Sequence, residues 1–147
     1  MRALDLSHWR HFCLAAIVFA ATSFSACAQN VVAIVAASTP QGTLTRNALR
    51  TAFSMRLNKW PDGNRMTVYV LPDYDPIHAA FCKEVLDVYP HQLRLVWDRL
   101  VFSGTGQAPR EVESEDEMIA KIAVTPGAIG YVKRNKLDER VRSLELY

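Results

Sequence analysis

The sequence has few cysteines and lacks an apolar run long enough to cross a membrane. Its apolar stretch FCLAAIVFAATSF falls short of the ~20 residues that a transmembrane helix needs. Two of the three cysteines, Cys13 and Cys27, lie near the N-terminus, and only Cys82 lies in the rest of the chain. One cysteine cannot form an internal disulfide, so packing alone must stabilise the fold. We expect Cys82 to be a small buried side chain rather than a reactive thiol.

The N-terminal segment has the features of a secretory signal peptide. Arg2 and Arg10 give it a positive start, and the apolar stretch follows them. Ala26-Cys27-Ala28 then fits the small-x-small pattern of a cleavage site. We therefore expect cleavage after residue 28, which leaves a secreted domain at 29–147.

A second interpretation of the same segment is a lipoprotein signal. Phe24-Ser25-Ala26-Cys27 resembles the box in which the cysteine becomes the lipidated N-terminus. Phenylalanine stands where the box usually has leucine, and this favours plain secretion over lipidation of Cys27.

The sequence also lacks an excess of charge. It has 17 basic and 15 acidic residues, and loss of Arg2, Arg10 and Asp5 with the leader leaves 15 and 14. Nothing in this balance favours nucleic acid as a partner. The 119 residues of 29–147 are enough for one core and too few for two full domains.

No catalytic motif is present. The chain has no Gly-x-Ser-x-Gly, no His-Glu-x-x-His and no phosphate-binding loop ending in Gly-Lys-Ser/Thr. Asp73, Asp75 and His78 are suitable ligand types for zinc or manganese, but Asp75 is already explained as a helix N-cap and no histidine or cysteine cluster supports a metal. We predict neither an enzyme nor a metal or cofactor site.

What the sequence does contain is an alternation of strands and helices. The apolar, β-branched run VVAIVA at 31–36 predicts a strand covered on both faces, and further strands are predicted at 66–71, 128–132 and 141–146. Helix starts are marked by Thr45, by Asp75-Pro76, by Pro90, and by the capping-box sequence Ser114-Glu115-Asp116-Glu117. Trp60-Pro61-Asp62-Gly63 has proline and glycine where a type I turn needs them.

This alternation predicts a compact α/β domain with a largely parallel sheet flanked by helices. In such sheets ligands bind where strands end and helices begin. The loops at 38–43, 72–76 and 103–109 are therefore the places where we expect a site.

These features together resemble a known family, the phosphate-binding branch of the periplasmic solute-binding proteins of ABC transporters. The likeness is closer still to their small single-unit relatives in Gram-negative bacteria. It covers nearly all of residues 31–133 and implies a periplasmic-binding-protein-like fold. The residues that carry it are Ser38-Thr39-Pro40 after the first strand, Trp60-x-Asp62-Gly63, WDRLVFSGTGQAP, and the closing TPGAIGYV at 125–132.

The chain departs from the family at one motif. Where the phosphate-binding proteins have Arg-x-x-Gly-Ser-Gly-Thr, residues 71–78 read LPDYDPIH. Backbone amides at that helix start still attract an anion, whereas Asp73 and Asp75 would repel one.

The resemblance implies roles for several residues. In the family the glycine-rich strand packs tightly at the hinge, so we expect Gly127 and Gly130 to be structural, with Tyr131 either against the first strand or facing the cleft. Ser38 and Thr39 match positions that offer hydroxyls and amides to the ligand, although a simple local turn is the alternative. Ser103-Gly104-Thr105 is a further candidate, either as an anion-binding nest of amides or as a plain helix terminator.

The predicted function is the reversible capture of a small oxyanion such as phosphate, without chemistry, in the periplasm. The implied partner is an ABC transporter permease or another envelope protein, with no role for nucleic acid. The alternative is a degenerate solute-binding lobe that serves as a protein-interaction module for a transporter or a sensor, which the acidic Asp73–His78 loop would suit better than phosphate.

Overall fold

The computed structural model describes residues 31–40 and 43–147. The predicted signal peptide and Cys27 lie outside the described residues. No helix within the described part of the chain is both long and apolar enough to cross a membrane.

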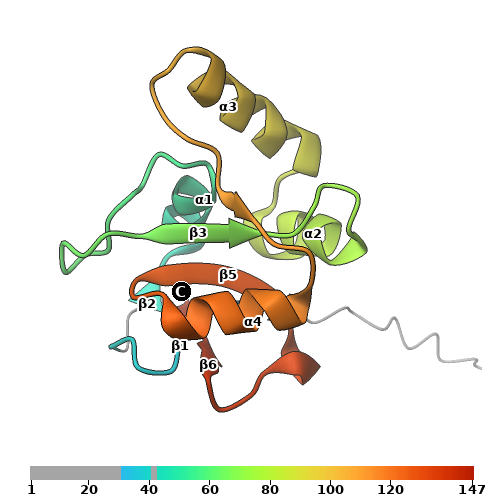
Figure 1. The fold of residues 1–147 in the computed structure, drawn as a ribbon. Helices are drawn as coiled ribbons and strands as arrows, with labels where there is room; N and C mark the ends of the chain where they lie inside the picture. Colours follow the sequence, from blue (N-terminus) through green and yellow to red (C-terminus); the bar gives the residue numbers. More distant parts are fainter. Residues whose placement is uncertain (1–30, 41–42) are drawn as a thin grey trace, which may run out of the picture.

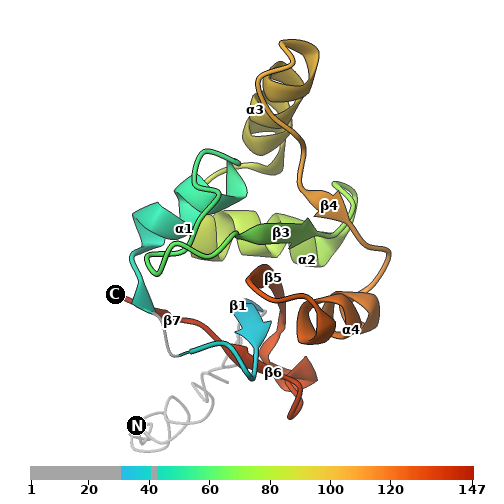
Figure 2. The ribbon, with the colours of Figure 1, turned by 60° about the vertical axis from the view of Figure 1, so that its left-hand side comes forward.

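The centre of the molecule is a five-stranded sheet in the order β4-β3-β5-β1-β6 (Figures 1 and 2). Its strands are β1 (Val31–Ala36), β3 (Thr67–Val70), β4 (Arg110–Glu111), β5 (Ala128–Lys133) and β6 (Val141–Ser143). Strand β3 pairs in parallel with β4 and β5, whereas β1 is antiparallel to β5 and β6. Two short strands, β2 (Thr43–Leu44) and β7 (Glu145–Leu146), form a separate parallel pair.

The predicted α/β class is confirmed, and three of the five described pairings are parallel. The apolar first strand is buried along its whole length, as predicted, although its own neighbours run antiparallel to it. Burial on both faces therefore comes from the helices that cover the sheet, whatever the direction of the strands.

Each face of the sheet packs against different helices. Side chains of neighbouring residues point to opposite faces of a strand, and β5 shows the two sides clearly. A Cβ on Gly130 would lie 2.5 Å from Sδ of Met118 in α4 (Glu115–Val124). Tyr131 instead stacks on Phe81, with ring centroids 4.0 Å apart, on the face covered by the helices at 46–86.

The predicted helix starts are confirmed. Thr45 caps α1 (Arg46–Phe53), Asp75 caps α2 (Pro76–Ala80), and Ser114 caps α4. The capping box at Ser114 is only half formed, because the Glu117 carboxylate accepts from the amide of Glu113 and not from that of Ser114.

The sequence analysis did not predict a π-helix. Helix α2 runs on into a π-helix, η1 (Phe81–Leu86), which ends at Asp87 in the left-handed conformation, φ 55°. The wider turn buries Phe81, Cys82, Val85 and Leu86, so the predicted burial of Cys82 is confirmed.

Helix α3 (Pro90–Phe102) stands apart from the rest of the molecule in both ribbon views (Figures 1 and 2). Only Leu93 and Trp97 are buried along its length. Its C-terminal end carries Phe102, which is 89% exposed.

Candidate ligand-binding cavity

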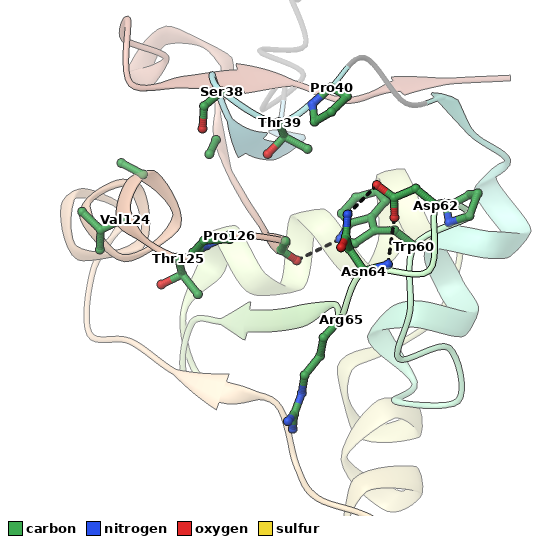
Figure 3. Close-up of a pocket in the computed structure, with 14 residues that line it drawn as sticks. Ser38, Thr39, Pro40, Trp60, Asp62, Asn64, Arg65, Val124, Thr125 and Pro126 are labelled. Atoms are coloured by element: carbon green, nitrogen blue, oxygen red, sulfur yellow. Dashed lines mark hydrogen bonds between the residues drawn. The ribbon is translucent and has the colours of Figure 1, made fainter.

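A cavity of about 600 Å³ opens where the end of β1, the turn after α1 and the C-terminal end of α4 come together (Figure 3). Its lining comes from three segments far apart in the sequence. The lining residues are Ala36, Ser38, Thr39, Pro40, Trp60, Pro61, Asp62, Asn64, Arg65, Ala123, Val124, Thr125, Pro126 and Gly127.

The first wall is the loop after β1, which contains the predicted site residues Ser38 and Thr39. The Thr39 amide donates to the carbonyl of Ala36 (3.0 Å), which turns the chain out of the strand. Nη2 of Arg142, from β6, donates to the carbonyls of Thr39 and Pro40 at 2.7 Å each. This places the hydroxyls of Ser38 and Thr39 toward the cavity (Figure 3).

The second wall is the turn at 60–65, which was predicted from its proline and glycine. The Gly63 amide donates to the carbonyl of Trp60 (2.9 Å), and both oxygens of Asp62 accept from Asn64, from its backbone amide (2.9 Å) and its side chain (2.8 Å). The carboxylate of Asp62 is therefore held in place beside the cavity.

The third wall is the segment that leads from α4 into β5. Gly127 has φ +73°, and a Cβ there would lie 2.2 Å from the carbonyl oxygen of Arg65. Nε1 of Trp60 donates to the carbonyl of Gly127 (2.9 Å). The predicted structural role of Gly127 is confirmed, because only glycine fits where the turn and β5 touch.

Two charged residues, Asp62 and Arg65, line the cavity. Asp62 has no ion pair with any residue that the structure describes. Arg65 lines the wall but its guanidinium points away from the other labelled side chains (Figure 3). Helix α4 ends at the cavity, and a helix C-terminus carries a partial negative charge.

The second predicted segment, Ser103-Gly104-Thr105, does not reach this cavity; Thr105 lines a separate hollow with residues that include Met55 and Lys59. Its amides are not free either. The amides of residues 103–106 all donate to carbonyls in the last turn of α3, at 3.0–3.1 Å. Of the two interpretations given for this segment, these bonds favour the helix terminator over the anion nest, since the four amides already donate to carbonyls of α3.

The third loop, at 72–76, does not line this cavity, and its Asp73 lies at the exposed edge of a polar cluster that includes the buried His78. Oδ2 of Asp73 accepts from Nε of Arg94 (2.7 Å), so its charge is balanced. Nε2 of His78 lies 3.7 Å from the other oxygen of Asp73. No group of three or more metal-ligating side chains is arranged to hold an ion within the described residues.

The same cluster shows where Tyr131 lies. Its hydroxyl bonds with Nδ1 of His78 and accepts from the amide of Leu71 (2.8 Å). Tyr131 therefore faces the helices and not the cavity. Burial lowers the pKa of His78, raises the pKa of the Tyr131 hydroxyl, and raises the pKa of Cys82 to about 12.

Sequence reasoning did not name the polar and aromatic residues of the second and third walls as ligand-binding residues. Trp60, Asn64 and Thr125 line the cavity with Asp62, and the hydroxyl of Thr125 lies 3.4 Å from that of Tyr69. The turn signal at 60–63 was the available clue, but it gave no indication that β5 would lie beside it.

Comparison with known proteins gives a likeness of fold. No family model and no curated protein matches the chain. A solved structure described as a phosphate ABC transporter substrate-binding protein with bound phosphate, from Clostridium perfringens, matches with a TM-score of 0.63 and 14% identity. A phosphate transport receptor from Vibrio cholerae (0.62, 13%) and PstS from Borrelia burgdorferi (0.60, 15%) match similarly.

Each match covers 80% of this chain but only 44%, 46% and 47% of the respective neighbour. The chain thus spans less than half the length of these proteins. The resemblance predicted from sequence, to PstS-like substrate-binding proteins, is confirmed at the level of the fold.

Proposed function

We propose that this protein is a solute-binding domain that captures a small ligand reversibly in the cavity after β1 and performs no chemistry on it. The observation that carries this is the position of Ser38 and Thr39. Their hydroxyls point into a cavity at the end of a central strand (Figure 3), in a fold shared with proteins described as substrate-binding proteins of transporters.

A thermal-shift series tests this proposal. The panel contains inorganic oxyanions, nucleotides, carboxylates and organic amines, each added to the purified protein. A ligand that binds only the folded state stabilises it by ~2.7 kcal/mol at a hundredfold excess over its Kd, which raises the unfolding midpoint clearly.

Removal of the two hydroxyls locates the binding site. We expect the double variant Ser38→Ala/Thr39→Ala to lose most of the midpoint shift, since each hydrogen bond to a ligand contributes about 1 kcal/mol. Ser103→Ala/Thr105→Ala removes the same two kinds of hydroxyl outside the cavity and should keep the shift. If no compound raises the midpoint at millimolar concentration, the solute-binding function is wrong.

The finer prediction from the sequence is that the ligand is a small oxyanion such as phosphate, with an ABC transporter as the partner. The bound phosphate of the Clostridium perfringens protein supports it, as do the two hydroxyl donors, whereas the carboxylate of Asp62 in the cavity lining counts against it. The phosphate and sulfate arms of the same series test it directly.

A second candidate function, the interaction module, is favoured by α3. Beyond its two buried side chains it exposes Leu95, Val101 and Phe102, which are 57%, 50% and 89% exposed. Large exposed apolar side chains on a helix suit a protein contact. In this chain they give better support to that function than the Asp73–His78 loop, because Asp73 is already paired with Arg94.

The variant Phe102→Ala tests that candidate. We expect its free energy of unfolding to stay within about 0.5 kcal/mol of the parent, because the ring packs on nothing. A photo-crosslinking residue at 102 should capture a transporter or sensor of the envelope, whereas one at the exposed Tyr147 should not. Equal capture from both positions would count against a role for α3.

A further inference from the structure

We infer that the ligand of the cavity is an organic molecule with an apolar body and a positively charged amine head, and not a small inorganic oxyanion. This inference rests on the proposed function and names its ligand class. It follows from the size, the lining and the charge of the same cavity.

The size of the cavity suits an organic molecule. Its volume of about 600 Å³ falls in the range of sites for small organic ligands, roughly 300–1,000 Å³. A tetrahedral oxyanion has only five heavy atoms and would fill the space of a few water molecules, at about 30 Å³ each. Such an ion would leave most of the cavity to solvent.

The lining is largely apolar. Seven of the fourteen lining residues have apolar side chains, and they come from all three walls: Ala36, Pro40, Trp60, Pro61, Ala123, Val124 and Pro126. Val124 is 78% exposed, which leaves apolar surface on the rim for a ligand to cover. Burial of that surface contributes to binding only when the ligand is itself apolar.

The negative groups that line the cavity favour a ligand with a positively charged head group. Among the described residues, the carboxylate of Asp62 accepts hydrogen bonds only from the backbone amide and side chain of Asn64. Helix α4 ends at another wall of the cavity, and its C-terminus carries a partial negative charge of about half a unit. Both features attract a cation and repel an anion.

Two cations lie near the cavity, but neither forms an ion pair with Asp62 among the described residues. The guanidinium of Arg65 points away (Figure 3), and Nη2 of Arg142 donates to the carbonyls of Thr39 and Pro40. An amine head next to Asp62 would find a charged acceptor there.

Titration calorimetry with a matched series tests the inference. Three probes share one phenylpropyl body and differ in the head: 3-phenylpropylamine, 3-phenylpropanol and 3-phenylpropionate. Methylamine supplies the head without the body, and inorganic phosphate is the oxyanion. We expect the amine to bind about tenfold tighter than the carboxylate, a difference of about 1.4 kcal/mol, because a partly exposed charge contact favours the amine and disfavours the carboxylate by less than about 1 kcal/mol each. Methylamine and phosphate should bind weakly or not at all.

Two variants assign the preference to the cavity. Asp62→Asn should remove most of the difference between amine and carboxylate, while Glu139→Gln, which removes an exposed acid elsewhere, should leave it unchanged. A preference that survives Asp62→Asn overturns the assignment of Asp62.

The outcomes separate the two claims. Tighter binding of phosphate or of the carboxylate, lost in Ser38→Ala/Thr39→Ala, overturns the ligand class and leaves the solute-binding function standing. If none of the five probes binds in the calorimeter, the inferred ligand class is wrong. If, in addition, no compound of the thermal-shift panel raises the unfolding midpoint, the solute-binding function is wrong as well.

Discussion

At the scale of single residues, two glycines with positive φ illustrate different reasons for the same choice. Gly63 has φ +86° in the turn beside the cavity, and a Cβ there would meet nothing within 4 Å. Gly127 has φ +73°, and its Cβ would collide with the carbonyl of Arg65. The first position needs glycine for its backbone conformation alone, and the second needs it also for space.

The comparison of Gly127→Ala with Gly63→Ala measures the clash. We expect Gly63→Ala to cost about 1 kcal/mol of unfolding free energy, the strain of a left-handed alanine. Gly127→Ala should cost about 3 kcal/mol or more, because the turn must also separate from β5 and weaken the bond from Trp60. Urea unfolding of both variants gives the difference, and equal losses would show that the contact between the turn and β5 is not tight.

At the scale of elements, α4 is tied to the sheet at its first turn as well as through its apolar face. Glu115 is 8% exposed, and its carboxylate accepts from the amide of Lys133 at the end of β5 (2.6 Å) and lies 3.6 Å from Nζ of the same lysine. This contact fixes the N-terminal end of the helix, while the opposite end of α4 forms a wall of the cavity.

The variant Glu115→Ala should therefore lower the free energy of unfolding by about 2 kcal/mol, the contribution of a hydrogen bond to a charged group. Asp116→Ala is the matched control: its exposed carboxylate pairs with Lys136 at 3.3 Å, and such surface pairs contribute at most about 1 kcal/mol. Thermal unfolding of the two variants should differ clearly. A loss for Asp116→Ala as large as that for Glu115→Ala would contradict the role given to Glu115.

At the scale of the whole molecule, the stability of the fold depends on pH through His78, which is buried beside one face of the sheet. His78 is 1% exposed, contacts Tyr131, Cys82 and Asp73, and lies in the field of Arg94 and Asp75. Burial lowers its pKa in the folded state. The unfolded chain therefore binds a proton that the folded protein does not, so stability falls as the pH drops below the unfolded value of about 6.5.

We expect the free energy of unfolding to be constant just above neutral pH and to decline below about pH 6.5, by at most about 1.4 kcal/mol per pH unit from this one group. His78→Gln should be less stable at neutral pH and should flatten the decline, whereas His91→Gln, at an exposed position, should retain it. Unfolding curves across this pH range decide the point, and an unchanged decline in His78→Gln would assign it to other groups.

The sequence by itself determined the local structure of this protein. Apolar runs gave β1, β3 and β5, and the capping residues Thr45, Asp75 and Ser114 gave the helix starts, because these signals act between residues a few positions apart. It also indicated that Cys82 is buried and that Ser38 and Thr39 follow a central strand.

Only the tertiary structure decided which of these features form a site. Trp60 and Gly127 are 67 positions apart in the sequence, and Arg142 and Thr39 are 103 apart, yet each pair forms a hydrogen bond. A pattern of neighbouring residues cannot predict either contact. The amides of residues 103–106 are used by α3, and the charge of Asp73 is balanced by Arg94. Whether a donor is free or a charge is unbalanced depends on what packs beside it. Of the three loops that the sequence proposed, only the one at 38–43 has described residues in the cavity that also contains Asp62, an acid without an ion pair among the described residues.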